Sequence, residues 1–155
     1  MYEEKILIGT DTTSGIAPQI LNAIAEASHI KTLPYGNDIV TEECKNIVKN
    51  IFENSDLEII PMVSGTASNS LALSSFLRSY GNIICHSDAH INKDEAGAPE
   101  FFSGGGKLNN ISNSQGLIKA QDLQKKIDEI NFKRKSSPLI SGVSITQLAE
   151  NGTFY

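Results

Sequence analysis

The sequence predicts an α/β fold, a three-layer α/β/α sandwich around a mainly parallel sheet. Two observations carry this prediction: helical and strand-like apolar patterns alternate along the chain, and the run at 81–85 is short and apolar enough to be a buried strand. At 155 residues the chain is long enough for one domain, and neither a linker composition nor an internal repeat divides it. We therefore expect a single unit over 1–155.

Two helices and a strand are expected in the first part of the chain. Residues 16–27 carry apolar side chains at helical spacing, with Pro18 in the first turn, where proline is tolerated. Residues 39–54 form a second amphipathic helix with one apolar stripe. The apolar run at 57–63 follows as a strand.

The second part alternates more regularly. A helix is expected over 66–80, a buried strand over 81–85 and a helical turn over 92–98. Three successive glycines at 104–106 form a turn before a strand at 107–111. A helix over 119–132 and a strand over 139–146 complete the pattern.

Charge and composition exclude several classes of protein. The formal net charge is -5 and the pI is about 5.1, which argues against a nucleic-acid or anionic membrane surface. Cys44 and Cys85 are too few for a disulfide scaffold, which fits a reduced, cytoplasmic location. No apolar run approaches the roughly 18 residues of a membrane span, and the first residues lack the pattern of a signal peptide.

The junction Ser64-Gly65-Thr66 is the most informative motif, because an apolar run ends there and a helical pattern begins. Backbone N–H groups and the positive end of the helix dipole converge at such a point, so the junction can hold a phosphate. An ordinary helix N-cap is the alternative reading. No Gly-Lys-Ser/Thr follows, so the motif is not a P-loop.

A second motif, His86-Ser87-Asp88-Ala89-His90, follows the strand at 81–85. In an extended segment His86, Asp88 and His90 would point to one side, as metal ligands do, which keeps a metallohydrolase open as an alternative. A hydrogen-bonded loop histidine is a second interpretation. The third is that one imidazole lies flat against a heteroaromatic ring whose phosphate is held near Thr66.

Taken together, short segments spread over most of the chain resemble the amino-terminal half of the low-specificity threonine aldolases, within the beta-eliminating lyase group of pyridoxal 5'-phosphate (PLP) fold type I enzymes. The resemblance rests on the order and spacing of these segments: Asp11 with Gly15 and Pro18, Tyr35-Gly36-Asn37-Asp38, Ser64 to Asn69, Ala89-His90, Asp94 to Ala98, Ser144 to Gln147 and Glu150 to Thr153.

The resemblance implies an incomplete fold type I large domain and a set of site residues. Ser64, Gly65 and Thr66, with Asn69 nearby, would bind the PLP phosphate. His90 would stack on the pyridine ring, and Glu95 matches a family acid near the cofactor, which makes these two the candidate catalytic residues. Asp11 and Tyr35 match positions on the substrate side, where the family builds its site across a subunit interface, so a homo-oligomer, a dimer or tetramer, is implied.

The activity implied by the resemblance is the cleavage of 3-hydroxy amino acids, such as threonine to glycine and acetaldehyde. The family's Schiff-base lysine belongs to a segment after the position of Tyr155, and neither Lys93 nor Lys107 matches it. We therefore expect the 155-residue chain to be inactive alone. A non-catalytic phosphate-binding or oligomerisation module is the alternative function.

Overall fold

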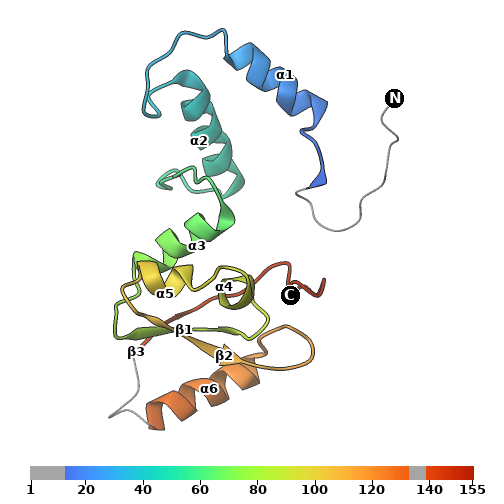
Figure 1. The fold of residues 1–155 in the computed structure, drawn as a ribbon. Helices are drawn as coiled ribbons and strands as arrows, with labels where there is room; N and C mark the ends of the chain where they lie inside the picture. The colour runs from blue at the N-terminus through green and yellow to red at the C-terminus, as the bar shows by residue number, and fades with distance from the viewer. Residues whose placement is uncertain (1–12, 133–138) are drawn as a thin grey trace, which may run out of the picture. The chain divides into compact units, whose positions relative to one another are not determined.

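The computed structural model describes residues 13–132 and 139–155 (Figure 1). The chain divides into two compact units, Met1–Ile59 and Ile60–Tyr155. The sequence has no linker composition at residue 60, so composition gives no signal of this division.

The first unit contains two helices, both close to the predicted ones. Helix α1 spans Pro18–Ala27 and has proline at its first position, as predicted. Helix α2 spans Ile39–Ile51 and begins after Asp38, whose carboxylate accepts a hydrogen bond from the Thr41 N–H at 2.8 Å. The Thr41 hydroxyl also donates to this carboxylate, and these two bonds lower the pKa of Asp38. Asp38 is therefore an N-cap residue.

The strand predicted over 57–63 is wrong, because the structure has irregular backbone there. Pro61 has no N–H to contribute to a ladder, and the described part of the chain offers this segment no neighbouring strand. Consequently, none of its apolar side chains is buried. Ile60 is 66% exposed and Val63 is 99% exposed.

The second unit is built around a parallel sheet of three strands in the order β2-β1-β3. The strands are β1 (Gly81–His86), β2 (Lys107–Ile111) and β3 (Leu139–Val143), and the helices are α3 (Gly65–Ser74), α4 (His90–Lys93), α5 (Ala98–Phe102) and α6 (Ala120–Phe132). Helix α3 and strand β3 are shorter than predicted, ending at residues 74 and 143. The hydroxyl groups of Ser74 and Ser75 donate to the carbonyls of Leu71 and Ala72 where α3 ends.

Strand β1 forms the core of this unit, because its side chains pack alternately on the two faces of the sheet. Ile83 and Cys85 belong to a cluster with side chains of α3 and α4, including Leu73 and Ile91. Ile84 faces the other way, in a cluster of buried residues with Ile111, Ile118 and Ile130.

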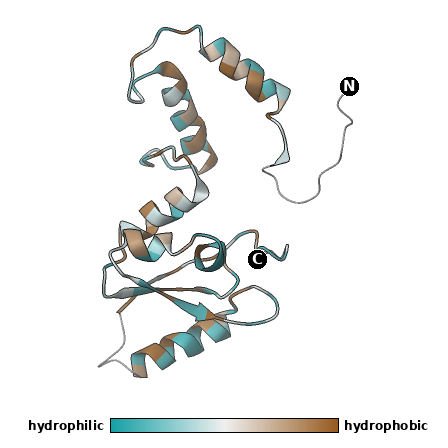
Figure 2. Cartoon of the chain, viewed as in Figure 1, coloured by the Kyte–Doolittle hydropathy of each residue, from teal (hydrophilic) through white to brown (hydrophobic). Residues whose placement is uncertain are grey.

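Helices therefore cover both faces of the sheet, α3 to α5 on one side and α6 on the other (Figure 1). Hydrophobic and hydrophilic residues alternate along α6, as expected for a helix with one apolar face (Figure 2). The three-layer α/β/α prediction is confirmed. Among the described residues, none of the helices has the length and apolar character that crossing a bilayer requires.

Candidate cofactor site

Helix α3 begins at the junction that the sequence singles out. Ser64 is the N-cap residue: its hydroxyl oxygen accepts a hydrogen bond from the Ala67 N–H at 3.1 Å, and its carbonyl accepts one from the Ser68 N–H. The N–H groups of Gly65 and Thr66 precede these two donors. Because they belong to the first turn, the residues four positions earlier lie outside the helix and offer these N–H groups no helical carbonyl. An N-cap and a pair of amides available to an anion therefore occur together.

Gly65 has no conformational or steric reason to be glycine in the part of the chain that the structure describes. Its φ lies outside the left-handed region, and a Cβ added there would meet no atom within 4 Å. Alanine at a helix start is at least as stable as glycine. A close approach of a ligand to the main chain is a reason for glycine that remains compatible with this geometry.

His90 and Glu95 lie in the segment that follows β1. His90 is the first residue of α4, and Glu95 follows this short helix. Oε1 of Glu95 lies 2.8 Å from Nδ1 of His90 and accepts a hydrogen bond from Nδ2 of Asn69 at 2.6 Å. The sequence prediction thus placed three residues in one site that the structure joins directly, although it assigned Asn69 to the phosphate and gave it no contact with Glu95.

A tight turn returns the chain from Glu95 to α5. Ala96 has φ of 50° and Gly97 has φ of 76°, so two successive residues adopt the left-handed conformation. Glycine adopts it freely, whereas alanine does so at a cost of about 1–2 kcal/mol. The unfavourable conformation of Ala96 therefore occurs directly after Glu95, whose carboxylate is buried.

The two members of the His90–Glu95 pair differ in exposure. The Glu95 side chain is 0% exposed, whereas that of His90 is 42% exposed and therefore accessible from solvent. The hydrogen bond to Glu95 raises the pKa of His90, and the negative charges of Glu95, Glu150 and Asp94 add smaller contributions in the same direction. A buried carboxylate that holds an exposed imidazole fixes the orientation of the ring.

His86 and Asp88 have partners other than His90. The N–H groups of Asp88 and Asn113 lie 3.0 Å from Nδ1 and 3.2 Å from Nε2 of His86, so protein groups face both nitrogens of this buried ring. Asp88 forms an ion pair with Lys93.

The three motif residues, His86, Asp88 and His90, therefore do not converge on a common point. In residues 13–132 and 139–155, no group of three or more His, Cys, Asp or Glu side chains is placed to hold a metal ion.

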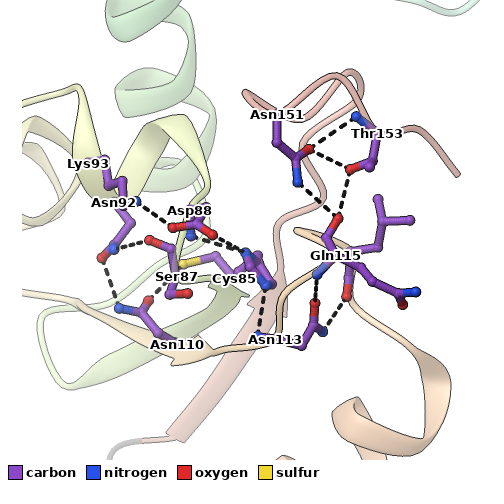
Figure 3. A network of polar contacts seen from close by, with 12 residues as sticks. Cys85, Ser87, Asp88, Asn92, Lys93, Asn110, Asn113, Gln115, Asn151 and Thr153 are labelled. Carbon is purple, nitrogen blue, oxygen red and sulfur yellow. Dashed lines mark hydrogen bonds and ion pairs between the residues drawn. The ribbon is translucent and has the colours of Figure 1, made fainter.

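A network of asparagine contacts supports the loops next to the site (Figure 3). The Cys85 thiol donates to Oδ1 of Asn110, and the Asn110 amide donates to Oδ1 of Asn92 at 3.0 Å. The Asn92 amide in turn donates to the Ser87 carbonyl at 2.8 Å. These contacts tie β2 to the segment that leads into His90.

A second part of the network holds the end of the chain (Figure 3). The Asn151 amide and the Thr153 hydroxyl both donate to the carbonyl of Gln115, and the Gln115 N–H donates to Asn113. Sequence reasoning missed these asparagine contacts, because a polar residue near a turn has many local explanations. The segment 150–153, which carries part of the family resemblance, is thereby placed beside the loop that follows β2.

Neither of the two substrate-side candidates belongs to the unit that carries this site. Asp11 lies outside the described residues. Tyr35 belongs to the first unit, where it follows α1 with φ of 63° and is 97% exposed. The roles predicted for both residues stay predictions.

His90 and Glu95 follow the carboxyl end of β1, and in an open parallel α/β sheet the carboxyl ends of the strands are where ligands bind. The family model for beta-eliminating lyase matches residues 8–155. The chain belongs to this family.

Curated relatives agree with this assignment, and a solved structure agrees with the fold. The low specificity L-threonine aldolase of Pseudomonas sp. (strain NCIMB 10558) is 36% identical over 157 residues, which cover 100% of this chain and 44% of the relative. That of Pseudomonas aeruginosa is 37% identical over 149 residues, covering 94% and 41%. A structure of threonine aldolase from Leishmania major matches with a TM-score of 0.83 at 24% identity, covering 92% of this chain and 41% of that one, and this likeness supports the fold.

The chain thus spans less than half the length of the curated relatives that it matches. The prediction of an incomplete fold type I domain is confirmed.

Proposed function

We propose that this chain is the phosphate-binding and ring-binding part of a PLP-dependent lyase that cleaves 3-hydroxy amino acids, such as threonine to glycine and acetaldehyde. The family and the names of the curated relatives support the reaction class. A cytoplasmic location and a homo-oligomeric state are parts of the same proposal.

One observation carries the proposal: the Ser64-Gly65-Thr66 junction and His90 are connected through one face of α3. Gly65 and Asn69 are four residues apart, so they lie one above the other on the same side of the helix. Asn69 contacts the carboxylate of Glu95, and this carboxylate contacts His90. His90 is therefore connected through two hydrogen bonds to the face of α3 on which Gly65 and Asn69 lie.

The residues of this site fit PLP in distinct ways. The amides of Gly65 and Thr66, with the hydroxyl protons of Ser64 and Thr66, would hold the phosphate at the positive end of α3. The exposed face of His90 would pack on the pyridine ring, with Glu95 fixing the plane of the imidazole. When bound, PLP supplies an electron-withdrawing ring that stabilises the negative charge left when the bond between the α and β carbons breaks.

We also propose that the 155-residue chain binds PLP without cleaving threonine. Lys93 is the lysine closest in sequence to His90, and its ion pair with Asp88 raises its pKa. A lysine that forms a Schiff base needs the opposite shift, because the neutral amine is the nucleophile. Lys107 is exposed at the start of β2, the end of the strand away from the His86 loop.

The test is PLP binding to the purified chain, measured by equilibrium dialysis for the wild type, Gly65→Ala and the double variant Gly65→Ala/Thr66→Ala. A methyl group at position 65 obstructs the anion, and Thr66→Ala removes a hydroxyl donor. We expect the double variant to bind at least about tenfold more weakly, the effect of losing one charge-assisted hydrogen bond. Ser68→Ala changes an exposed position of the same helix and is the matched control.

Gly65→Ala should leave the folded state as stable as before or slightly more stable, since nothing in the described chain obstructs the new methyl group. Weaker binding with undiminished stability would assign the effect to the ligand. Unchanged affinity in the double variant would show that the junction is a helix cap only. Glycine production from threonine by the purified chain would contradict the second proposal, and peptide mapping would identify the lysine used.

A further inference from the structure

Asn69 of α3 and His90 of α4 share one partner atom. The Asn69 amide donates to Oε1 of Glu95 at 2.6 Å, and Nδ1 of His90 lies 2.8 Å from the same oxygen. The other oxygen of this carboxylate, Oε2, is buried and has no hydrogen-bond partner within the described residues. Two helices therefore meet at a single oxygen of a buried acid.

The burial of Glu95 makes each of these contacts important. Its side chain is 0% exposed, and a carboxylate removed from water is stable only when other groups donate to it. Without Asn69, His90 would be the remaining partner of the carboxylate, and it is itself on the surface. The orientation of Glu95 toward His90 therefore depends on a residue that does not touch His90.

We propose that Asn69 is a positioning residue for His90, acting through Glu95. It holds the carboxylate so that Oε1 accepts a hydrogen bond from Nδ1–H of His90, which fixes the tautomer and the plane of the imidazole. Only one part of this inference rests on the proposed function, namely that the fixed imidazole packs on the cofactor ring. The contacts themselves exist in the chain without the cofactor.

The charges around His90 make its protonation a measure of this arrangement. The hydrogen bond to Glu95 is the largest cause of its raised pKa. Smaller contributions come from the negative charges of Glu95, of Glu150 in the carboxyl-terminal segment and of Asp94 at the end of α4, while burial acts in the opposite direction. A Glu95 carboxylate that turned away would leave only the smaller contributions of Glu150 and Asp94.

The experiment is an NMR titration of the histidine imidazoles in the 155-residue chain without PLP. The variants are Asn69→Ala, Glu95→Gln and the double variant of both, with Ser68→Ala as the control on α3. We expect Glu95→Gln to lower the titration midpoint of His90, and Asn69→Ala to lower it most of the way to the same value. The double variant should not go lower than Glu95→Gln, because the two residues act in series.

The ¹⁵N shifts of the neutral imidazole give a second readout. In the wild type we expect the proton on Nδ1 of His90, whereas Asn69→Ala should show a mixture of tautomers. The signals of His29 and His86 report whether the chain has kept its fold. Asn69→Leu keeps the branched shape of the side chain without the donor. The same change of midpoint in Asn69→Leu and Asn69→Ala would show that the lost donor, and not the smaller size of alanine, is the cause.

Two results would overturn the inference. A His90 midpoint and tautomer that stay as in the wild type in folded Asn69→Ala or Asn69→Leu would show that Glu95 needs no support from α3. Loss of folding in both variants would show that Asn69 stabilises the fold rather than positions His90. Neither outcome depends on PLP, so the proposed function is tested separately by the binding experiment.

Discussion

The thiol of Cys85 on β1 donates a hydrogen bond to Oδ1 of Asn110 on β2, with 3.1 Å between the two atoms. Cys85 is 0% exposed, and burial raises the pKa of its thiol to about 11, with a smaller contribution from the charge of Glu100. The thiolate is the reactive form of cysteine, so the burial that raises this pKa keeps Cys85 unreactive at neutral pH.

We therefore expect one of the two cysteines to react at pH 8. Exposed Cys44 should be alkylated quickly by iodoacetamide, whereas Cys85 should react only when the chain unfolds. Mass spectrometry of the intact chain would show a single added group in native buffer and two in denaturant. Cys44→Ser is the control, because Cys85 is then the remaining cysteine. Rapid labelling of this variant in native buffer would contradict the prediction.

The His90–Glu95 pair predicts how stability changes with pH. The pKa of His90 is raised in the folded state, so the folded chain holds this proton more tightly than the unfolded one. The stabilisation is fully present below the unfolded pKa of roughly 6.5 and is lost as pH rises through the folded pKa.

The measurement is the thermal midpoint as a function of pH for the wild type and for Glu95→Gln, in which the carboxylate charge is absent. As pH rises through the pKa of His90, the thermal midpoint of the wild type should fall more steeply than that of the variant. Parallel curves for the two proteins would show that His90 and Glu95 are not coupled in solution.

His90 also distinguishes ring packing from other roles. Packing needs the flat face of an aromatic side chain, so His90→Phe should retain much of the PLP affinity that His90→Ala loses. Equilibrium dialysis of the two variants beside the wild type provides the comparison. Equal loss in both would indicate that a nitrogen of the imidazole is required, and stoichiometric zinc or manganese in the purified chain, absent from both variants, would favour the metallohydrolase alternative.

Gly106 offers a steric contrast to Gly65. A Cβ added at Gly106 would lie 2.6 Å from two carbon atoms of Leu77 and 2.9 Å from the hydroxyl of Ser103, all in the core beside the start of β2. Gly106→Ala should lower the free energy of unfolding by about 1–3 kcal/mol, the usual cost of overpacking. Urea denaturation would measure it, with Gly65→Ala as the unobstructed control; equal stabilities would mean that Leu77 moves away at little cost.

Local sequence patterns predicted most of the helices and strands that the structure contains. The strand at β1, the glycine turn before β2 and the amphipathic helix α6 follow from apolar spacing and from turn residues. The run at 57–63 has an equally apolar pattern and is not a strand, because strand formation depends on a partner that local sequence does not specify.

The site shows the same limit. The cap at Ser64 could be read from the residues that follow it, and the structure confirms its geometry. The bond between Asn69 and Glu95 spans 26 positions and depends on how α3 packs beside the loop after α4, so no periodicity reports it. The same holds for the contact between His86 and the Asn113 backbone, which is set by the pairing of β1 with β2.

The central position of β1 has a consequence for the order in which the chain can fold during synthesis. Residues 81–84 pair with β3, whose first residue, Leu139, leaves the ribosome more than fifty positions later. At about 5–20 residues per second, this interval lasts about 3–11 seconds. Throughout it, one edge of the most buried strand in the unit has no native partner, and a nascent chain in that state is exposed to aggregation and to chaperones.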